Sequence, residues 1–201
     1  TAAGGLVGEV VQIWKPKELN TFETEWGFSC MSYEISGALG IKMAKPDQDV
    51  IVFVGDGSYL LQNSDIYSSV LYDKKLIIVV CDNGGHMVIN RLQLAKGGNE
   101  YLCNLNAARA TNVQFVDFEA HAKSMGANGE TVKSISELEA AFKRAKESDK
   151  TYVISMKTDG YEWLEGTAFW ESPTLEVEKT EGNKAAFKEF LEGKNKQRKG
   201  V

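Results

Sequence analysis

Residues 49–57, Asp49-Val-Ile-Val-Phe-Val-Gly-Asp-Gly57, indicate the fold class more clearly than any other part of the chain. The uninterrupted β-branched and aromatic run is typical of a parallel strand buried on both faces, and glycine with aspartate marks its end. Lys75-Leu-Ile-Ile-Val-Val-Cys81 repeats this pattern, and Asp82-Asn83-Gly84-Gly85 follows it as a turn. A short helix is expected between the two runs, over residues 64–72. The pair therefore predicts strand, helix and strand.

Helix and strand patterns alternate through the rest of the chain. Residues 32–44 place Ile35, Leu39 and Met43 four residues apart, which is the stripe of an amphipathic helix. Residues 151–157 form another apolar run that is predicted to be a strand. Strands that alternate with helices favour an α/β fold, here a doubly wound parallel sheet with helices on both faces.

Two more helices are predicted after residue 116, and a long loop before it. Asp117 is expected to cap a helix over residues 117–125. Ser136-Glu-Leu-Glu139 has the spacing of a capping box, which predicts a helix to about residue 147. Residues 86–111 are polar and show no firm period. A loop of this length in a compact domain is usually functional or disordered.

The length of the chain suits one domain with a short tail. With 201 residues and 43% apolar side chains, the chain can bury one sizeable core. We expect a single domain over residues 1–170 and a charged, helical tail over residues 171–201, with an amphipathic stretch around Phe187 and Phe190. The chain opens on Thr1 with neither an initiator methionine nor a signal peptide, so it is expected to be a fragment of a longer polypeptide.

The composition argues against several classes of partner. The net charge is −5 and the basic residues form no stripe, so nucleic acid is not an expected partner. Apolar runs such as Leu76 to Cys81 are far shorter than the roughly 20 residues needed to cross a bilayer, so no membrane span is expected. Cys30, Cys81 and Cys103 are too scattered for a disulfide framework and are interpreted as buried, reduced thiols of a cytoplasmic protein.

Polar turns follow both buried strands, at the end of a parallel sheet where ligands bind. Asp56 and Asn83 are separated by one helix and one strand, so both side chains are expected at the same edge of the sheet. Glycines allow a phosphate to approach the backbone, and carboxylate and amide oxygens are ligands that Mg²⁺ accepts. The two turns together predict a diphosphate and metal site. Gly55-Asp56-Gly57 taken alone is explained equally well by a tight strand-to-helix turn.

These turns resemble the signature of thiamine-diphosphate-dependent enzymes, in their C-terminal, diphosphate-binding domain: Gly-Asp-Gly, then a helix and a strand, then Asn and a turn with glycine. The resemblance implies thiamine diphosphate and Mg²⁺ as cofactors. It implies that the metal is bound by Asp56, Asn83 and the carbonyl of Gly85, and the cofactor by Gly55, Gly57, Ser58, Asn83 and Gly85. Asp82 stands where the family often has Asn, which affects local hydrogen bonding rather than the metal.

An upstream segment, Phe28-Ser-Cys-Met-Ser32, resembles the turn that supports the cofactor rings in this family. By that resemblance Met31 props the two rings into a bent conformation, and the carbonyl of Ser29 accepts a hydrogen bond from the pyrimidine. A core methionine is the alternative for Met31. Relatives take the glutamate that activates the pyrimidine from another domain, usually of a second subunit. The resemblance therefore implies a pyrimidine-binding partner domain, a homo-oligomer when the protein is full length, and an inactive isolated chain.

A narrower resemblance covers almost the whole chain and points to ring-opening hydrolases of inositol catabolism. Five segments carry it: Trp26 to Ile35, Gly55 to Leu60, Ile89 to Gln93, Asp117 to Ala122 and Trp163 to Gly166. The resemblance implies a small cyclic diketone as substrate and cleavage of one of its carbon–carbon bonds.

Several alternatives stay open. His86, beside the metal turn, can exchange protons with a substrate near neutral pH or can be an ordinary loop histidine. His121 is expected to be structural. The chain can also belong to an acetolactate synthase-like or decarboxylase-like enzyme, or be a non-catalytic cofactor-binding module. The β-chain of an oxoacid oxidoreductase is disfavoured, because such chains commonly carry cysteine clusters for iron–sulfur centres, whereas the three cysteines here are scattered.

Overall fold

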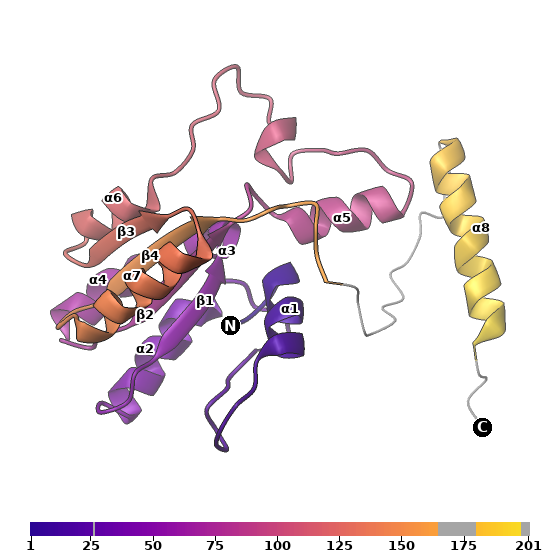
Figure 1. Ribbon diagram of the computed structural model, residues 1–201. Coiled ribbons are helices and arrows are strands. Elements are labelled where there is room, and N and C mark those ends of the chain that lie inside the picture. The colour runs from indigo at the N-terminus through magenta and orange to yellow at the C-terminus, as the bar shows by residue number, and fades with distance from the viewer. Residues whose placement is uncertain (26, 165–179, 198–201) are drawn as a thin grey trace.

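The computed structural model describes residues 1–25, 27–164 and 180–197. Its elements are α1 (Gly5–Ile13), α2 (Tyr33–Ala44), β1 (Ile51–Gly55), α3 (Asp56–Leu61), α4 (Ser64–Leu71), β2 (Ile77–Asp82), α5 (Met87–Ala95), η1 (Leu105–Ala107), α6 (Phe118–Ser124), β3 (Asn128–Val132), α7 (Ile135–Glu147), β4 (Tyr152–Lys157) and α8 (Glu181–Lys196). Figure 1 shows the strands and most helices in one body, with α8 beside the end of α5.

The four strands of the sheet run parallel in the order β1-β2-β4-β3. β1 pairs with β2 up to Gly55, which lies opposite Cys81. β2 pairs with β4 up to Asp82, which lies opposite Lys157. The turns that follow β1 and β2 are therefore neighbours at the carboxyl edge of the sheet, with the end of β4 beside them.

Helices cover both faces of the sheet (Figure 1). On one face, Val52, Ile78 and Val153 belong to a core cluster that includes residues of α2, α4 and α6. On the other face, Ile77 and Ile154 pack with residues of α7. Adjacent residues of one strand point to opposite faces, which is why a strand buried on both sides is apolar throughout. The predicted doubly wound α/β fold is confirmed.

Several elements were not predicted from the sequence: α1, α3, α5, η1 and β3. α5 occupies much of the region predicted to be a loop over residues 86–111, so that prediction is wrong for Met87–Ala95. The buried residues of α5 are Met87 and Asn90, and a polar residue on the buried face hides the apolar period of the helix. β3 reads Asn-Gly-Glu-Thr-Val and lies at the edge of the sheet, where a continuous apolar run is not required.

The helix α7 is capped by Ser134 rather than by Ser136. Oγ of Ser134 accepts a hydrogen bond from the backbone N–H of Glu137 at 3.2 Å, and the Glu137 carboxylate accepts one from the backbone N–H of Lys133 at 2.7 Å. The predicted capping box of Ser136 with Glu139 is therefore wrong. Both serines precede a glutamate at the same spacing, and the extended backbone of Ser134, with φ −147° and ψ 162°, distinguishes the true cap.

Ser134→Ala is expected to lower the free energy of unfolding by about 1 kcal/mol, because the N–H of Glu137 loses its acceptor at the start of α7. Ser136→Ala is the matched control, and we expect it to cost less than about 0.5 kcal/mol. Urea unfolding of both variants measures the difference. An equal or larger loss in Ser136→Ala would show that the cap has been assigned to the wrong serine.

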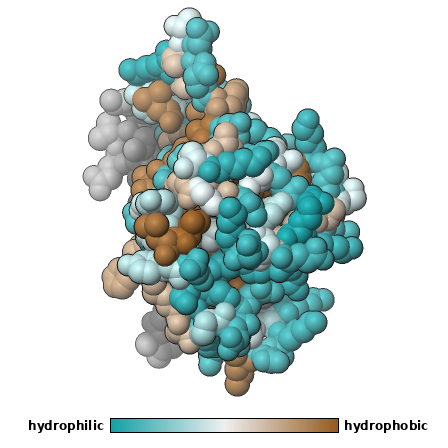
Figure 2. Space-filling view, turned by 90° about the vertical axis from the view of Figure 1, so that its left-hand side faces the viewer, coloured by the Kyte–Doolittle hydropathy of each residue, from teal (hydrophilic) through white to brown (hydrophobic). Residues whose placement is uncertain are grey.

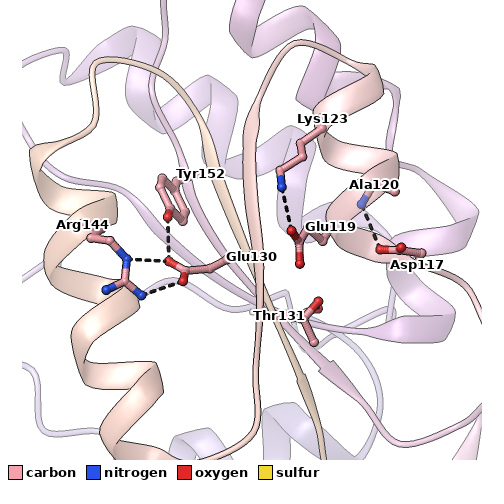
Figure 3. Close-up of polar contacts among 9 residues, drawn as sticks. Asp117, Glu119, Ala120, Lys123, Glu130, Thr131, Arg144 and Tyr152 are labelled. Carbon is pink, nitrogen blue, oxygen red and sulfur yellow. Dashed lines mark hydrogen bonds and ion pairs between the residues drawn. The ribbon is translucent and has the colours of Figure 1, made fainter.

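Glu130 links the edge strand β3 to β4 and α7 through hydrogen bonds (Figure 3). Its carboxylate accepts hydrogen bonds from the Tyr152 hydroxyl of β4 at 2.6 Å and from Arg144 of α7 at 2.6 and 3.1 Å. Nearby, Oδ1 of Asp117 accepts a hydrogen bond from the backbone N–H of Ala120 at 2.9 Å, which confirms the predicted cap of α6. These contacts lie on the β3 side of the sheet and stabilise the fold there.

The outer surface agrees with most expectations from composition. The face in Figure 2 is mostly hydrophilic, with a few separate hydrophobic patches. Within the described residues, no helix combines the length and the apolar character that a membrane crossing requires. The three cysteines are free, but Cys30 is exposed and Cys81 and Cys103 are only half-buried, so their predicted burial is wrong. The domain boundary predicted at residue 170 lies outside the described residues, whereas α8 provides the helix predicted around Phe187 and Phe190.

Candidate functional site

Asp56 and Asn83 meet at the carboxyl ends of β1 and β2, as the sequence predicts. Asp56 is the first residue of α3 and is buried, with 6% of its surface exposed. The side-chain amide of Asn83 approaches Oδ1 of Asp56 at 3.2 Å and the carbonyl oxygen of Gly85 at 2.9 Å, and its nitrogen faces both oxygens when the amide satisfies its hydrogen bonds. A carboxylate, an amide and a backbone carbonyl thus converge on one point.

The carboxylate of Asp56 lies in an unfavourable electrostatic environment. Burial raises its pKa above the ordinary value, and the neighbouring Asp82 carboxylate raises it further, against hydrogen bonds from the backbone of Gly57, Asn83 and Gly85. None of the ion pairs among the described residues includes Asp56. A buried carboxylate without a cationic partner is costly, and a bound cation would remove that cost.

The donor set suits a hard divalent cation. Half a turn of the Asn83 amide directs its oxygen, instead of its nitrogen, toward the other two oxygens, which makes three oxygen ligands. Mg²⁺ is typically bound by one or two carboxylates with further oxygens from substrate phosphates and water. In the described parts of the chain, no group of three or more His, Cys, Asp or Glu side chains is arranged to hold a metal. The mixed set at Asp56 therefore fits Mg²⁺ better than a softer metal.

The turn after β2 has a backbone conformation that favours glycine. Gly84 and Gly85 have φ values of +81° and +140°. A Cβ on Gly85 would lie 2.5 Å from the carbonyl oxygen of Cys103, so a side chain does not fit there. The carbonyl of Gly84 accepts a hydrogen bond from the N–H of Leu105 at 2.9 Å, and the N–H of His86 donates to the carbonyl of Cys103 at 2.7 Å. The segment 103–105 therefore fixes the turn that carries the Gly85 carbonyl.

Gly57 and His86 are in contact at the start of α3. A Cβ on Gly57 would lie 2.7 Å from Nδ1 and 2.7 Å from Cε1 of His86, so the imidazole packs directly on the Gly57 backbone. His86 is otherwise exposed. The structure thus places His86 over the glycine that the sequence assigns to the diphosphate.

The hydroxyl of Ser58 joins two parts of the predicted site. Ser58 is 3% exposed, and its Oγ donates to Oε2 of Glu34 at 2.9 Å and accepts a hydrogen bond from the N–H of Ser32 at 2.6 Å. Burial raises the pKa of Glu34, and the Ser58 hydrogen bond opposes that rise. The hydroxyl is therefore engaged within the protein, by Glu34 and by the N–H of Ser32.

The turn predicted to support the cofactor rings lies just before α2. Ser29 is exposed with a φ of +52°, and Met31 is half-buried. The carboxylate of Glu25 accepts hydrogen bonds from the N–H groups of Phe28 at 2.8 Å and Cys30 at 2.6 Å, which orders the turn. Phe28 is 92% exposed. The turn therefore presents an apolar side chain outward beside the candidate cofactor residues.

Sequence reasoning missed several residues that shape the site. Glu34 and the segment 103–105 gave no recognisable pattern. Lys157 ends the third predicted strand, but only the pairing of β4 with β2 brings its Nζ to 2.5 Å from Oδ2 of Asp82. His121 is structural, as predicted, since its Nδ1 lies 2.9 Å from the hydroxyl of the buried Tyr59.

Of two cavities in the structure, one borders the candidate site at Asn83 and the other does not. The larger, of about 360 Å³, follows the open edge of β1 and is lined by Trp14, Phe22 and residues 50–53 among others. The smaller, of about 240 Å³, borders the site and includes Asn83 and Lys157 in its lining. The larger cavity therefore lies apart from the turns that carry Asp56 and Asn83.

Cofactors that contain a diphosphate bind parallel α/β sheets at this edge, where glycine turns admit the phosphates and hard oxygen ligands hold a cation. The fold and the two turns place the chain in that class of cofactor-binding domains. A family profile described as "Thiamine pyrophosphate enzyme, C-terminal TPP binding domain" matches residues 2–156. The chain belongs to this family.

Three curated relatives share one description, 3D-(3,5/4)-trihydroxycyclohexane-1,2-dione hydrolase. The protein from Halalkalibacterium halodurans is 36% identical over 92% of this chain and 29% of its own length. The one from Shouchella clausii is 39% identical over 83% of this chain and 27% of its own length. The one from Bacillus subtilis is 35% identical over 92% and 29%. The chain therefore spans less than a third of the length of these relatives.

A solved structure supports the fold. The thiamine diphosphate-dependent 4-hydroxybenzoylformate decarboxylase of Rhodococcus jostii superposes with a TM-score of 0.59 over 68% of this chain and 25% of that chain. The sequence identity is 22%, so this likeness concerns the fold alone.

Proposed function

We propose that this chain is the diphosphate- and Mg²⁺-binding domain of a thiamine-diphosphate-dependent hydrolase that opens the ring of 3D-(3,5/4)-trihydroxycyclohexane-1,2-dione in myo-inositol catabolism. The observation that carries the proposal is the convergence of Asp56, Asn83 and Gly85 in a chain of this cofactor family. The substrate is inferred from relatives of that description at 35% to 39% identity.

In this proposal the chain holds one end of the cofactor. Asp56, the oxygen of the Asn83 side chain and the carbonyl of Gly85 bind Mg²⁺, and the backbone of Gly55, Gly57 and Ser58 binds the diphosphate. Support comes from the buried carboxylate of Asp56, which lacks a cationic partner among the described residues, and from the open backbone at Gly55, where a Cβ would meet nothing within 4 Å.

We assign the binding of the cofactor rings to the turn before α2, residues 28–32. Met31 supports the cofactor rings, and the carbonyl of Ser29 accepts a hydrogen bond from the pyrimidine. The exposure of Ser29 and the half-buried position of Met31 support these roles. Bound thiamine diphosphate supplies the carbon nucleophile and the electron sink that cleavage of a carbon–carbon bond requires.

His86 is proposed to contact the diphosphate rather than to act on the substrate. Its imidazole packs on Gly57, within the turn assigned to the phosphates, and this contact supports a binding role more than a catalytic one. No general base is assigned to this chain.

The rest of the active site is proposed to come from a pyrimidine-binding domain of the same or a second subunit, in a cytoplasmic homo-oligomer. Exposed apolar residues around the site support a covering partner: Phe28 is 92% exposed and Phe115 62%. We assign residues 1–170 to the cofactor-binding domain and residues 171–201 to a helical tail.

The proposal is tested with a full-length protein that contains this chain, supplied with thiamine diphosphate and Mg²⁺. We expect it to consume the cyclic dione and to leave pyruvate and benzoylformate unchanged, with product formation followed by chromatography. Condensation or decarboxylation of pyruvate without turnover of the dione would favour the acetolactate synthase-like alternative. Cofactor binding without turnover of any of these substrates would favour a non-catalytic module.

A further inference from the structure

We propose that Lys157 is a positioning residue for the metal turn and that it acts through Asp82. Lys157 ends β4, Asp82 ends β2, and the two residues lie opposite each other in the parallel pairing of these strands. The inference rests on the proposed function, because the turn that Asp82 begins carries Asn83 and Gly85.

A continuous series of contacts leads from Lys157 to the predicted metal ligands. Nζ of Lys157 lies 2.5 Å from Oδ2 of Asp82, and Oδ1 of Asp82 accepts a hydrogen bond from the N–H of Gly84 at 3.1 Å. The next residue, Gly85, contributes the carbonyl that lies 2.9 Å from the Asn83 amide. One oxygen of Asp82 therefore shapes the turn, and the other binds the lysine.

The carboxylate of Asp82 is buried, so its charge needs the ion pair with Lys157. The residue is 6% exposed, and a buried carboxylate that loses its cation carries an uncompensated charge. The side chain would then turn toward water, and this change weakens its hold on the N–H of Gly84. An asparagine, which the family often has at this position, accepts the same hydrogen bond without needing a cation. We therefore infer that Asp82 and Lys157 form a functional pair.

Lys157 is a suitable position for a test. Its side chain is 62% exposed, with Nζ 4.8 Å from the ring centre of Phe115, so its replacement leaves no buried cavity. Methionine keeps most of the aliphatic length and removes the charge. The N–H of Thr158 donates to the carbonyl of Asp82 at 2.9 Å, and this backbone link between β4 and β2 stays in every variant.

The experiment uses a full-length protein that contains this chain, either unmodified or with Lys157→Met, Asp82→Asn or both changes, and titrates each protein calorimetrically with thiamine diphosphate at saturating Mg²⁺. We expect Lys157→Met to weaken binding about tenfold, as is typical when a residue behind a metal ligand is lost. The double variant is expected within about threefold of the unmodified chain, because the two changes compensate. Lys123→Met is the matched control, since it breaks the ion pair of Lys123 with Glu119 at 2.6 Å on α6 and should leave binding unchanged.

Hydrogen exchange of the Gly84 amide, measured without cofactor, provides a second readout. We expect faster exchange in Lys157→Met and recovery in the double variant. Unchanged affinity for thiamine diphosphate in Lys157→Met, or a double variant as weak as Lys157→Met, would each overturn the inference. If the unmodified full-length protein binds no cofactor, the proposed function fails, and the exchange of the Gly84 amide alone decides whether Lys157 holds the turn.

Discussion

In a full-length protein that contains this chain, Asp56→Ala is expected to weaken Mg²⁺-dependent binding of thiamine diphosphate by more than about 100-fold, beyond the range seen for residues behind a metal ligand. Asp56 is the one carboxylate of the converging set, and Asn83 and Gly85 contribute only neutral oxygens. Without its charge, Mg²⁺ loses the ligand that offsets its desolvation. Calorimetric titration with thiamine diphosphate, with and without Mg²⁺, measures the effect.

We expect Asp56→Ala to leave the folded chain as stable as the unmodified one. Burial and the Asp82 carboxylate raise the pKa of Asp56, so its ionised form destabilises the cofactor-free fold, and its removal relieves that repulsion. Asp49→Ala is the control, because Asp49 lies at the opposite end of the same strand region and forms a pair with Lys75 at 3.6 Å. Equal cofactor affinity in Asp56→Ala and Asp49→Ala would remove the metal assignment.

β1 and β2 could be predicted from sequence because helices on both faces of the sheet leave these strands almost wholly apolar. β1 and β2 are apolar on both faces, since helices pack on each side. β3 was not predicted, because an edge strand needs less apolar burial. The carboxylate of its Glu130 accepts hydrogen bonds from Tyr152 and Arg144, which belong to other elements. Such partners are set by tertiary contacts, which local patterns do not contain.

The same distinction applies to the candidate site. The meeting of Asp56 and Asn83 follows from a general rule, because turns after adjacent parallel strands share one edge. The role of Lys157 depends on the register of β4 against β2, and the engagement of Ser58 with Glu34 depends on how α2 packs beside α3. Neither register nor helix packing is encoded in a short motif. Coordination of Mg²⁺ by the converging groups stays a prediction.

The isolated chain is expected to show no measurable ring-opening activity, even with thiamine diphosphate and Mg²⁺ present, and to bind the cofactor weakly. By the proposed function, it supplies the contacts to the diphosphate and the metal, whereas the pocket for the pyrimidine ring and the glutamate that activates this ring are supplied from another domain. Loss of one well-placed acid–base group typically costs about 10²- to 10⁴-fold in rate. Loss of the closed pocket adds to this, because water then weakens every electrostatic contact with the reacting groups.

The exposed apolar residues around the site agree with a catalytic site that is shared between this chain and a second domain. Phe28 and Phe115 are largely exposed, and Tyr101 and Leu102 are half-exposed on the segment that leads into the turn support at 103–105. An open site also leaves the substrate unpositioned, which removes the large rate advantage of fixed geometry. We would measure consumption of the cyclic dione by the purified chain, and again after addition of a separately expressed pyrimidine-binding domain from a full-length relative. Recovery of turnover only in the mixture is the expected result, and turnover by the chain alone at the rate of a full-length enzyme would show that its own residues suffice for catalysis.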